Sequence, residues 1–200
     1  MRPHMERENL AAFERFVARS RVYLEYGSGG STVHVASHTK ADVLISVESD
    51  PAWVEKVRDA LKDFGASGMD TRLHLEFCDV GPVGAWGNPI DISGHARYHD
   101  YISRPWRRAA ELAVAPDTVL IDGRFRVACF LYSLICAEPG TTILFDDYMV
   151  RPEYFVVETF CARRESYGPL AVFEVTKTFD LPHLVAQLMA YSQTAVDRLD

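Results

Sequence analysis

A glycine-rich turn between an apolar strand and a helix is the feature of this sequence that most limits its fold. Residues 22–26 form a short apolar run, residues 27–30 read Gly-Ser-Gly-Gly, and a helical pattern begins near Ser31. Glycine takes positive φ angles and lets the backbone approach a neighbouring group, because it has no Cβ atom. Such a turn is typical of the first strand-to-helix connection in a doubly wound sheet. The turn therefore predicts an α/β fold with a mostly parallel sheet.

The rest of the chain alternates strand and helix patterns in the order that this fold requires. We predict strands at residues 22–26, 43–47, 72–77, 118–121, 141–145 and 170–175, and helices at residues 10–17, 31–38, 52–64, 98–113 and 125–137 and after Pro152. Continuous apolar strands are buried on both faces, which indicates a parallel sheet covered by helices on each side. The predicted architecture is a three-layer, Rossmann-like α/β/α sandwich that forms one domain over residues 1–200.

Two segments are expected to border a ligand site. Residues 1–20 contain an amphipathic helix that we expect to close over one end of the ligand cleft. Residues 81–91 are too rich in Gly and Pro for a helix or strand, and the whole connection, residues 80–100, exceeds the usual length of a loop. Loops this long in compact domains are usually lids or binding loops. The alternative is a solvated loop whose aromatic side chains fold back on the core.

Acidic residues near the turn indicate what it binds. Glu48 follows the turn by about 20 residues, where an acid at the tip of the second strand accepts hydrogen bonds from ribose hydroxyls. The third glycine of dinucleotide-binding turns is missing, and Glu25 precedes the turn, where it disfavours a pyrophosphate and favours a cationic ligand. The preferred ligand is S-adenosylmethionine, which carries an ammonium group and a sulfonium centre. An ordinary strand–turn–helix corner is the alternative.

At this point the sequence resembles the class I S-adenosylmethionine-dependent methyltransferases, over about residues 22–175. Their first motif, E-x-G-x-G-x-S in many members, is matched by residues 25–31. The resemblance implies cofactor contacts from Glu25, Gly27, Ser28, Gly29, Ser31, Glu48, Ser49, Asp79 and Asp122, with Asp79 accepting from the adenine amino group. It also implies an antiparallel seventh strand after Val175, although residues 181–189 have helical period. The C-terminal topology therefore stays open.

A second group of acids follows two later strands. Asp122 follows the strand at 118–121, and Asp146 and Asp147 follow the strand at 141–145. Carboxylates at the tips of adjacent strands repel one another unless a cation or shared protons compensate. A Mg²⁺ ion is one solution, since it prefers hard oxygen ligands. Pairing of Asp146 or Asp147 with Arg124, without any metal, is the other.

This cluster resembles the metal-dependent O-methyltransferases of the catechol type and the macrocin-type sugar methyltransferases. The resemblance implies that Asp122, Asp146 and Asp147 are metal ligands and that the methyl acceptor is a hydroxyl. Several macrocin-type enzymes carry an acid, proposed as the general base, at the position of Arg124, and an arginine cannot accept the proton.

The catalytic roles therefore rest on other groups. Asp122 would act through a bound metal that acidifies the substrate hydroxyl, or His95 or His99 from the long loop would accept the proton; of the two histidines we predict His99. Alternatively, Arg124 and Arg126 would hold an acidic group of the substrate.

Composition limits the partners. A net charge of −7 opposes nucleic-acid binding, which depends on neutralising phosphates with Lys and Arg. No apolar run approaches the ~20 residues of a membrane-spanning helix, and the charged N-terminus does not resemble a secretory signal. We therefore expect a soluble, cytoplasmic protein with a small-molecule substrate and no nucleic-acid or membrane partner. The oligomeric state stays open, a homo-oligomer included.

Three functions are compatible with these features. The leading hypothesis is an S-adenosylmethionine-dependent O-methyltransferase that acts on a small molecule such as a sugar or a phenol. The second is a methyltransferase-like protein that binds the cofactor without catalysis. The third, a nucleotide-dependent oxidoreductase, is disfavoured by the missing third glycine and by Glu25. Methyl transfer from a sulfonium needs little more than in-line positioning of a nucleophile, so the scaffold does not identify the acceptor.

Overall fold

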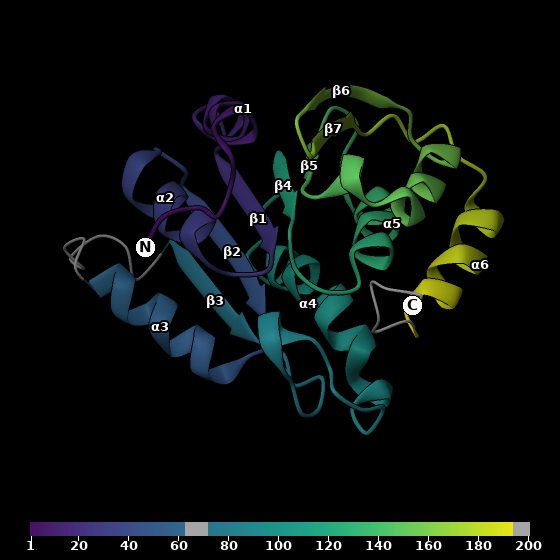
Figure 1. Ribbon diagram of the computed structural model, residues 1–200. Helices are drawn as coiled ribbons and strands as arrows, with labels where there is room; N and C mark the ends of the chain where they lie inside the picture. Colours follow the sequence, from purple (N-terminus) through teal and green to yellow (C-terminus); the bar gives the residue numbers. More distant parts are fainter. Residues whose placement is uncertain (63–71, 194–200) are drawn as a thin grey trace.

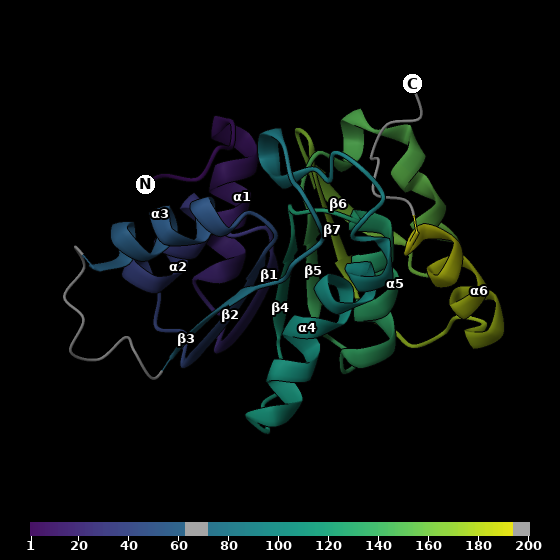
Figure 2. The same cartoon turned by 90° about the horizontal axis from the view of Figure 1, so that it is seen from below.

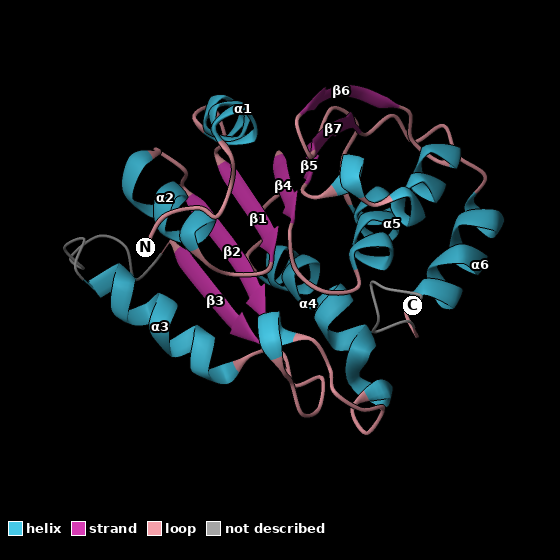
Figure 3. Ribbon diagram, in the orientation of Figure 1, coloured by secondary structure: helices cyan, strands magenta, loops and turns pink. Residues whose placement is uncertain are grey.

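Seven strands form one sheet in the computed structural model, which describes residues 1–62 and 72–193 (Figures 1 and 3). The strands are β1 (Val22–Tyr26), β2 (Val43–Glu48), β3 (Leu73–Phe77), β4 (Thr118–Ile121), β5 (Thr142–Phe145), β6 (Arg163–Tyr167) and β7 (Leu170–Glu174). Their order is β3-β2-β1-β4-β5-β7-β6; the first five are parallel, and β7 runs antiparallel to both neighbours. The predicted Rossmann-like α/β fold is confirmed.

Helices cover both faces of this sheet (Figure 2). They are α1 (Arg7–Val17), α2 (Gly30–His38), α3 (Pro51–Lys62), α4 (Tyr98–Glu111), α5 (Arg126–Cys136) and α6 (Leu181–Tyr191). Successive strand side chains point to opposite faces. Tyr23 therefore packs in the core beside α1 and α2, whereas Leu24 packs in the larger core with α4, α5 and α6. Because both faces are covered, the central strands are mostly apolar on both faces.

The order of the strands creates a crevice between β1 and β4. The chain leaves β1 toward β2 on one side and leaves β4 toward β5 on the other, so strand order reverses between them. Ligands of open α/β sheets bind at such a point, outside the carboxyl ends of the strands. At this point Asp122 N donates to Tyr26 O at 3.0 Å and so joins the ends of β4 and β1, while Gly27 N donates to Val47 O of β2 at 2.9 Å.

The C-terminal part differs from the prediction. The strand predicted at 170–175 is β7 and is itself the antiparallel strand, whereas no strand follows Val175 among the described residues. The helical period at 181–189 is a real helix, α6. β6 was not predicted, since its sequence is Arg-Arg-Glu-Ser-Tyr and it pairs on one side only. Charged residues are common on such edge strands because they discourage further pairing.

Other predicted boundaries shift little. The long loop contains two single 3₁₀ turns, η1 (Ala85–Gly87) and η2 (His95–Arg97), and the helix expected after Pro152 is also 3₁₀, η4 (Pro152–Thr159). The predicted end of the helix at 52–64 lies outside the described residues. Within residues 1–62 and 72–193, no helix is both long enough and apolar enough to cross a bilayer.

Candidate functional site

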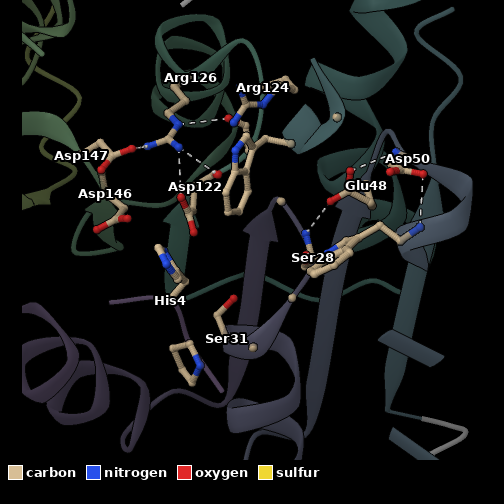
Figure 4. Close-up of a pocket in the computed structure, with 18 of the residues that line it drawn as sticks. His4, Ser28, Ser31, Glu48, Asp50, Asp122, Arg124, Arg126, Asp146 and Asp147 are labelled. Atoms are coloured by element: carbon tan, nitrogen blue, oxygen red, sulfur yellow. Dashed lines mark hydrogen bonds and ion pairs between the residues drawn. The ribbon is translucent and has the colours of Figure 1, made fainter. Parts of the chain in front are cut away.

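A cavity of about 940 Å³ opens at the carboxyl ends of β1, β2, β4 and β5 (Figure 4). Its lining comprises residues 1–5, 27–31, 86–89 and 122–124, together with Glu48, Asp50, Trp53, Tyr101, Arg126, Asp146, Asp147 and Arg151. Small-molecule sites usually measure ~300–1,000 Å³, so the cavity can hold a nucleoside-sized ligand beside a second small molecule.

The glycines of the turn are required for different reasons. Gly27 has a φ of +89°, and a Cβ there would come within 2.7 Å of the Cα of Gly123. A Cβ on Gly30 would meet the backbone of Arg2 at 2.0 Å, because the N-terminal segment crosses the start of α2. A Cβ on Gly29 would meet no atom closer than 3.8 Å and would point into the cavity. The turn therefore packs against β4 and the N-terminus and leaves one side open to a ligand.

Glu25, predicted to contact the cofactor, lies beneath the turn and does not line the cavity. It is fully buried and accepts hydrogen bonds from the hydroxyls of Thr32, Ser46 at 2.8 Å and Tyr23 at 2.9 Å. Thr32 Oγ1 accepts in turn from the Gly29 N–H at 2.7 Å. Burial raises the pKa of Glu25, and the donated hydrogen bonds oppose this change. Glu25 therefore shapes the turn from below.

Glu48 lines the cavity beside the turn (Figure 4). Its Oε2 accepts from the Ser28 N–H at 3.1 Å, and its Oε1 accepts from the N–H groups of Ser49 at 2.7 Å and Asp50 at 3.0 Å. Burial raises the pKa of Glu48, whereas these backbone donors lower it. The Ser49 hydroxyl donates to Gly87 O at 3.0 Å, and Ser49 does not line the cavity. Of these two predicted contacts, only Glu48 faces the ligand space.

Arg126, the first residue of α5, compensates the acids that follow β4 and β5. Its side chain is only 4% exposed; Nη2 lies 3.1 Å from Asp122 Oδ1 and Nη1 lies 3.2 Å from Asp147 Oδ2 (Figure 4). The same guanidinium donates to the main-chain oxygens of Asp122 at 3.1 Å, Gly123 at 3.0 Å and Asp146 at 2.7 Å. Arg126 therefore joins the ends of two strands and supplies the positive charge that the cluster needs.

The predicted Mg²⁺ site at Asp122, Asp146 and Asp147 is not supported. In the described part of the chain, no group of three or more His, Cys, Asp or Glu side chains is arranged to hold a metal ion. Asp122 and Asp147 pair with Arg126, and Asp146 accepts instead from Asn9 Nδ2 at 3.3 Å. The guanidinium of Arg126 thus supplies the positive charge that was predicted to come from Mg²⁺.

Two acids of the cluster hold protons more tightly than usual. The pKa of Asp146 is raised to about 7, first by burial and then by the charge of Asp122, while Arg126 lowers it. The pKa of Asp122 is raised to about 6, again chiefly by burial, with Arg126 opposing the shift. The single buried arginine therefore compensates the crowded carboxylates only in part.

We expect Asp146→Asn to raise the free energy of unfolding at pH 8 by about 1–3 kcal/mol. The folded state keeps a proton on Asp146 that the unfolded chain loses at about pH 4, so the wild type loses stability as the pH rises toward 7. The gain from the substitution should therefore shrink as the pH falls from 8 toward 4. Urea unfolding of both proteins across this range measures it, and a gain that is independent of pH would contradict the raised pKa.

Asp79 and His99 lie outside the cavity. Asp79 Oδ1 accepts from the Gly81 N–H at 2.8 Å, its other oxygen pairs with Arg97 at 3.3 Å, and more than half of its side chain is exposed. His99 is 67% exposed, and its Nε2 lies 3.7 Å from Asp100 Oδ1. Neither lines the cavity, so this structure does not bring the predicted adenine contact or the predicted histidine base to the site.

Part of the long loop does line the cavity. Arg124 Nη1 donates to Asn88 Oδ1 at 2.6 Å, and the Arg124 N–H donates to the hydroxyl of the buried Tyr101 at 3.2 Å. Trp86 in this loop is 75% exposed and has a left-handed φ of 60°, which is strained for a bulky residue. Residues 86–89 therefore border the ligand space, and their action as a lid stays a prediction.

Two contributors to the cavity were not predicted from the sequence. The first is the segment before α1, because residues 1–5 line the cavity whereas α1 itself, expected to close over it, does not; the ring of His4 in this segment lies 5.9 Å from that of Trp86. No local pattern marks a segment that precedes the first helix. The second is Trp53, whose Nε1 donates to Ser28 O at 2.7 Å. Trp53 follows the strand-end Asp50, which accepts from its N–H at 3.2 Å and begins α3, and this position could have indicated it.

The sheet order, the glycine turn and Glu48 in a cavity at the reversal of strand order define a Rossmann-like protein with a ligand-sized cavity at the usual binding position of this fold. The chain is similar to the crystal structure of a methyltransferase-like protein from Silicibacter pomeroyi DSS-3. The two are 36% identical over 96% of this chain and 98% of that chain, with a TM-score of 0.86. This chain belongs to the class I S-adenosylmethionine-dependent methyltransferases.

Two more distant structures share the fold alone. One is a candidate caffeoyl-CoA O-methyltransferase from Staphylococcus aureus, 10% identical over 87% of this chain and 86% of that chain, with a TM-score of 0.59. The other is the N-methyltransferase NodS from Bradyrhizobium japonicum WM9 in complex with S-adenosylhomocysteine, 12% identical over 84% of each chain, with a TM-score of 0.50. No protein-family model matches the sequence, and no curated protein matches it either.

We expect Glu48→Ala to weaken binding of S-adenosylhomocysteine by about 1.5–3 kcal/mol, because two ribose hydroxyls would lose a charged acceptor. Calorimetric titration of wild type and variant measures the difference. Glu48→Gln is the matched control, since it keeps the size of the side chain and one acceptor oxygen and should lose less. An unchanged dissociation constant for Glu48→Ala would remove Glu48 from the cofactor site.

Proposed function

We propose that this protein binds S-adenosylmethionine in the cavity and transfers its methyl group to a hydroxyl of a small molecule in the cytoplasm. The observation that carries the proposal is the position of Glu48, which lines the same cavity as the glycine turn and accepts from the Ser28 N–H of that turn. In this arrangement Glu48 would accept from the ribose, and Gly27, Ser28, Gly29 and Ser31 would approach the amino-acid part of the cofactor. Asp122, at the end of β4, would accept from its ammonium group.

The other end of the cavity supports a small acceptor. Asp146, Asp147 and Arg151 line it beyond Asp122, and together with the N-terminal residues they bound a space that is polar at this end. The net charge of −7 argues against an RNA or DNA substrate. The bound cofactor supplies the electrophilic methyl group, and the chain's residues orient the acceptor and exclude water.

The first experiment is calorimetric titration with S-adenosylhomocysteine and, separately, with NAD⁺ and NADH. Binding of the first ligand alone supports the proposal, whereas binding of NAD⁺ or NADH alone would favour an oxidoreductase. The second experiment measures transfer of a labelled methyl group to a panel of sugars, phenols and other hydroxyl compounds. Cofactor binding without transfer to any of them would favour a methyltransferase-like protein that only binds the cofactor.

A further inference from the structure

Asp146 differs from the two acids beside it. Asp122 and Asp147 both pair with Arg126 through their carboxylates, whereas the Asp146 carboxylate makes no ion pair with any described residue. Arg126 reaches Asp146 only through its main-chain oxygen, at 2.7 Å. Asp146 is nevertheless only 5% exposed, and its side chain lines the cavity. It is therefore a buried carboxylate, without a direct countercharge, at a ligand site.

Asn9 on α1 contacts Asp146 and can form a hydrogen bond with this carboxyl in either protonation state. Asn9 is 3% exposed, and its Nδ2 donates to Asp146 Oδ1 at 3.3 Å. Asn9 Oδ1 is buried and has no hydrogen-bond partner among the described residues. If the amide turns over, Oδ1 faces Asp146 and can accept a hydrogen bond, but only from a protonated carboxyl. A carboxyl that gains and loses a proton needs a donor beside its carboxylate form and an acceptor beside its acid form, and the Asn9 amide offers both.

The position of Asp146 in the cavity separates it from the cofactor half. Glu48 lies at one end of the site, Asp146 at the other end and Asp122 between them (Figure 4). The glycine turn contacts Gly123 at the end of β4, which leaves the end of β5 one strand further from the nucleoside. Asp146 is therefore on the side where the acceptor would bind.

We propose that Asp146 is the general base that takes the proton from the methyl acceptor, and that Asn9 is the positioning residue that holds its carboxyl. This inference rests on the proposed function. In the step, the acceptor O–H bond breaks and its proton moves to a carboxylate oxygen of Asp146. An electron pair of the acceptor oxygen forms the bond to the methyl carbon. The bond from that carbon to sulfur breaks, its electrons stay on sulfur, and a thioether remains.

The charges around Asp146 favour this role. Asp122 and Asp147 raise its pKa, Arg126 and the Asn9 amide lower it, and burial is the largest contribution, with a result of about 7. The N-terminal segment also brings His4 and Arg2 to the same cavity. A general base works best when its pKa is near the working pH, because it is then deprotonated often and still binds a proton well.

The first test follows the proton directly, with S-adenosylhomocysteine bound. Infrared difference spectra of wild type from pH 5 to 8 should contain a carboxylic acid band that titrates near pH 7. The band should be absent in Asp146→Asn, persist at a lower pH in the control Asp147→Asn, which removes a charge that raises the pKa of Asp146, and titrate at a different pH in Asn9→Leu. A band near pH 7 that persists in Asp146→Asn, or no carboxyl that titrates above pH 5, would overturn the inference.

The second test measures single-turnover methyl transfer to the best hydroxyl acceptor. Asp146→Asn should slow transfer by about 10²–10⁴-fold with little change in the dissociation constant of S-adenosylhomocysteine. Asn9→Leu should move the pH at which the rate is half-maximal, which a merely structural role would not do. Full activity of Asp146→Asn with intact cofactor binding would overturn only the inference. Failure of wild type to bind S-adenosylhomocysteine would overturn the proposed function as well.

Discussion

Replacing Arg126 with Met is expected to lower the free energy of unfolding by about 3–5 kcal/mol at pH 8, as when one partner of a buried ion pair is removed. The variant keeps most of the side-chain volume but leaves Asp122 and Asp147 without their buried countercharge. It also removes the donors to three main-chain oxygens at the ends of β4 and β5. Urea unfolding of wild type and variant measures the loss.

Arg151→Met is the matched control for this experiment. Arg151 also pairs with Asp147, but at 3.6 Å and with 28% of its side chain exposed. Partly exposed pairs contribute about 0–1 kcal/mol, so this variant should be close to wild type. The loss in Arg126→Met should be smaller at pH 5, where Asp122 and Asp146 are largely protonated. Similar stabilities for the two variants would show that Arg126 does not compensate the cluster.

Gly29→Val is expected to weaken S-adenosylhomocysteine binding by about a thousandfold, ~4 kcal/mol, while the protein still folds. Gly29 has an extended φ of 173°, which valine adopts readily, and an added Cβ meets no atom closer than 3.8 Å. The side chain would therefore occupy the cavity without a clash in the protein. Fold is checked by the melting temperature and binding by calorimetry.

Two further substitutions in the same turn test whether the loss of binding comes from the volume added at Gly29. Gly29→Ala adds less volume to the cavity and should lose less affinity than Gly29→Val. Gly27→Ala should destabilise the protein, because Gly27 has a positive φ and its Cβ would clash with Gly123. Tight binding of S-adenosylhomocysteine by Gly29→Val would show that the open side of the turn is not the cofactor site.

The order of elements and the general position of the site could be read from the sequence, because they depend on local patterns. The apolar run of β2 and the glycines after β1 are properties of short segments, and the parallel fold places their ends at one edge of the sheet. Glu48 follows from the same reasoning, since the last residue of a strand faces that edge. These features survive a shift of one or two residues in an element boundary.

Only the tertiary structure decided which of several side chains close in sequence line the cavity and which pair with the acids. Glu25 precedes the turn in sequence, yet its hydrogen bonds to Thr32 and Ser46 hold it below the turn and outside the cavity. Arg124 and Arg126 are two residues apart, and Phe125 between them has a left-handed φ of 55°. One guanidinium reaches Asn88 and the other reaches the acids.

Contacts between segments far apart in the chain could not be predicted from the sequence either. Asn9 and Asp146 are 137 positions apart, and Arg2 lies against Gly30 only because the N-terminal segment crosses α2. Local propensity determines which residues form a strand or a helix, whereas such contacts depend on how finished elements pack. The fold class of this protein was therefore set by short-range patterns, and the compensation of its buried charges was set by long-range packing.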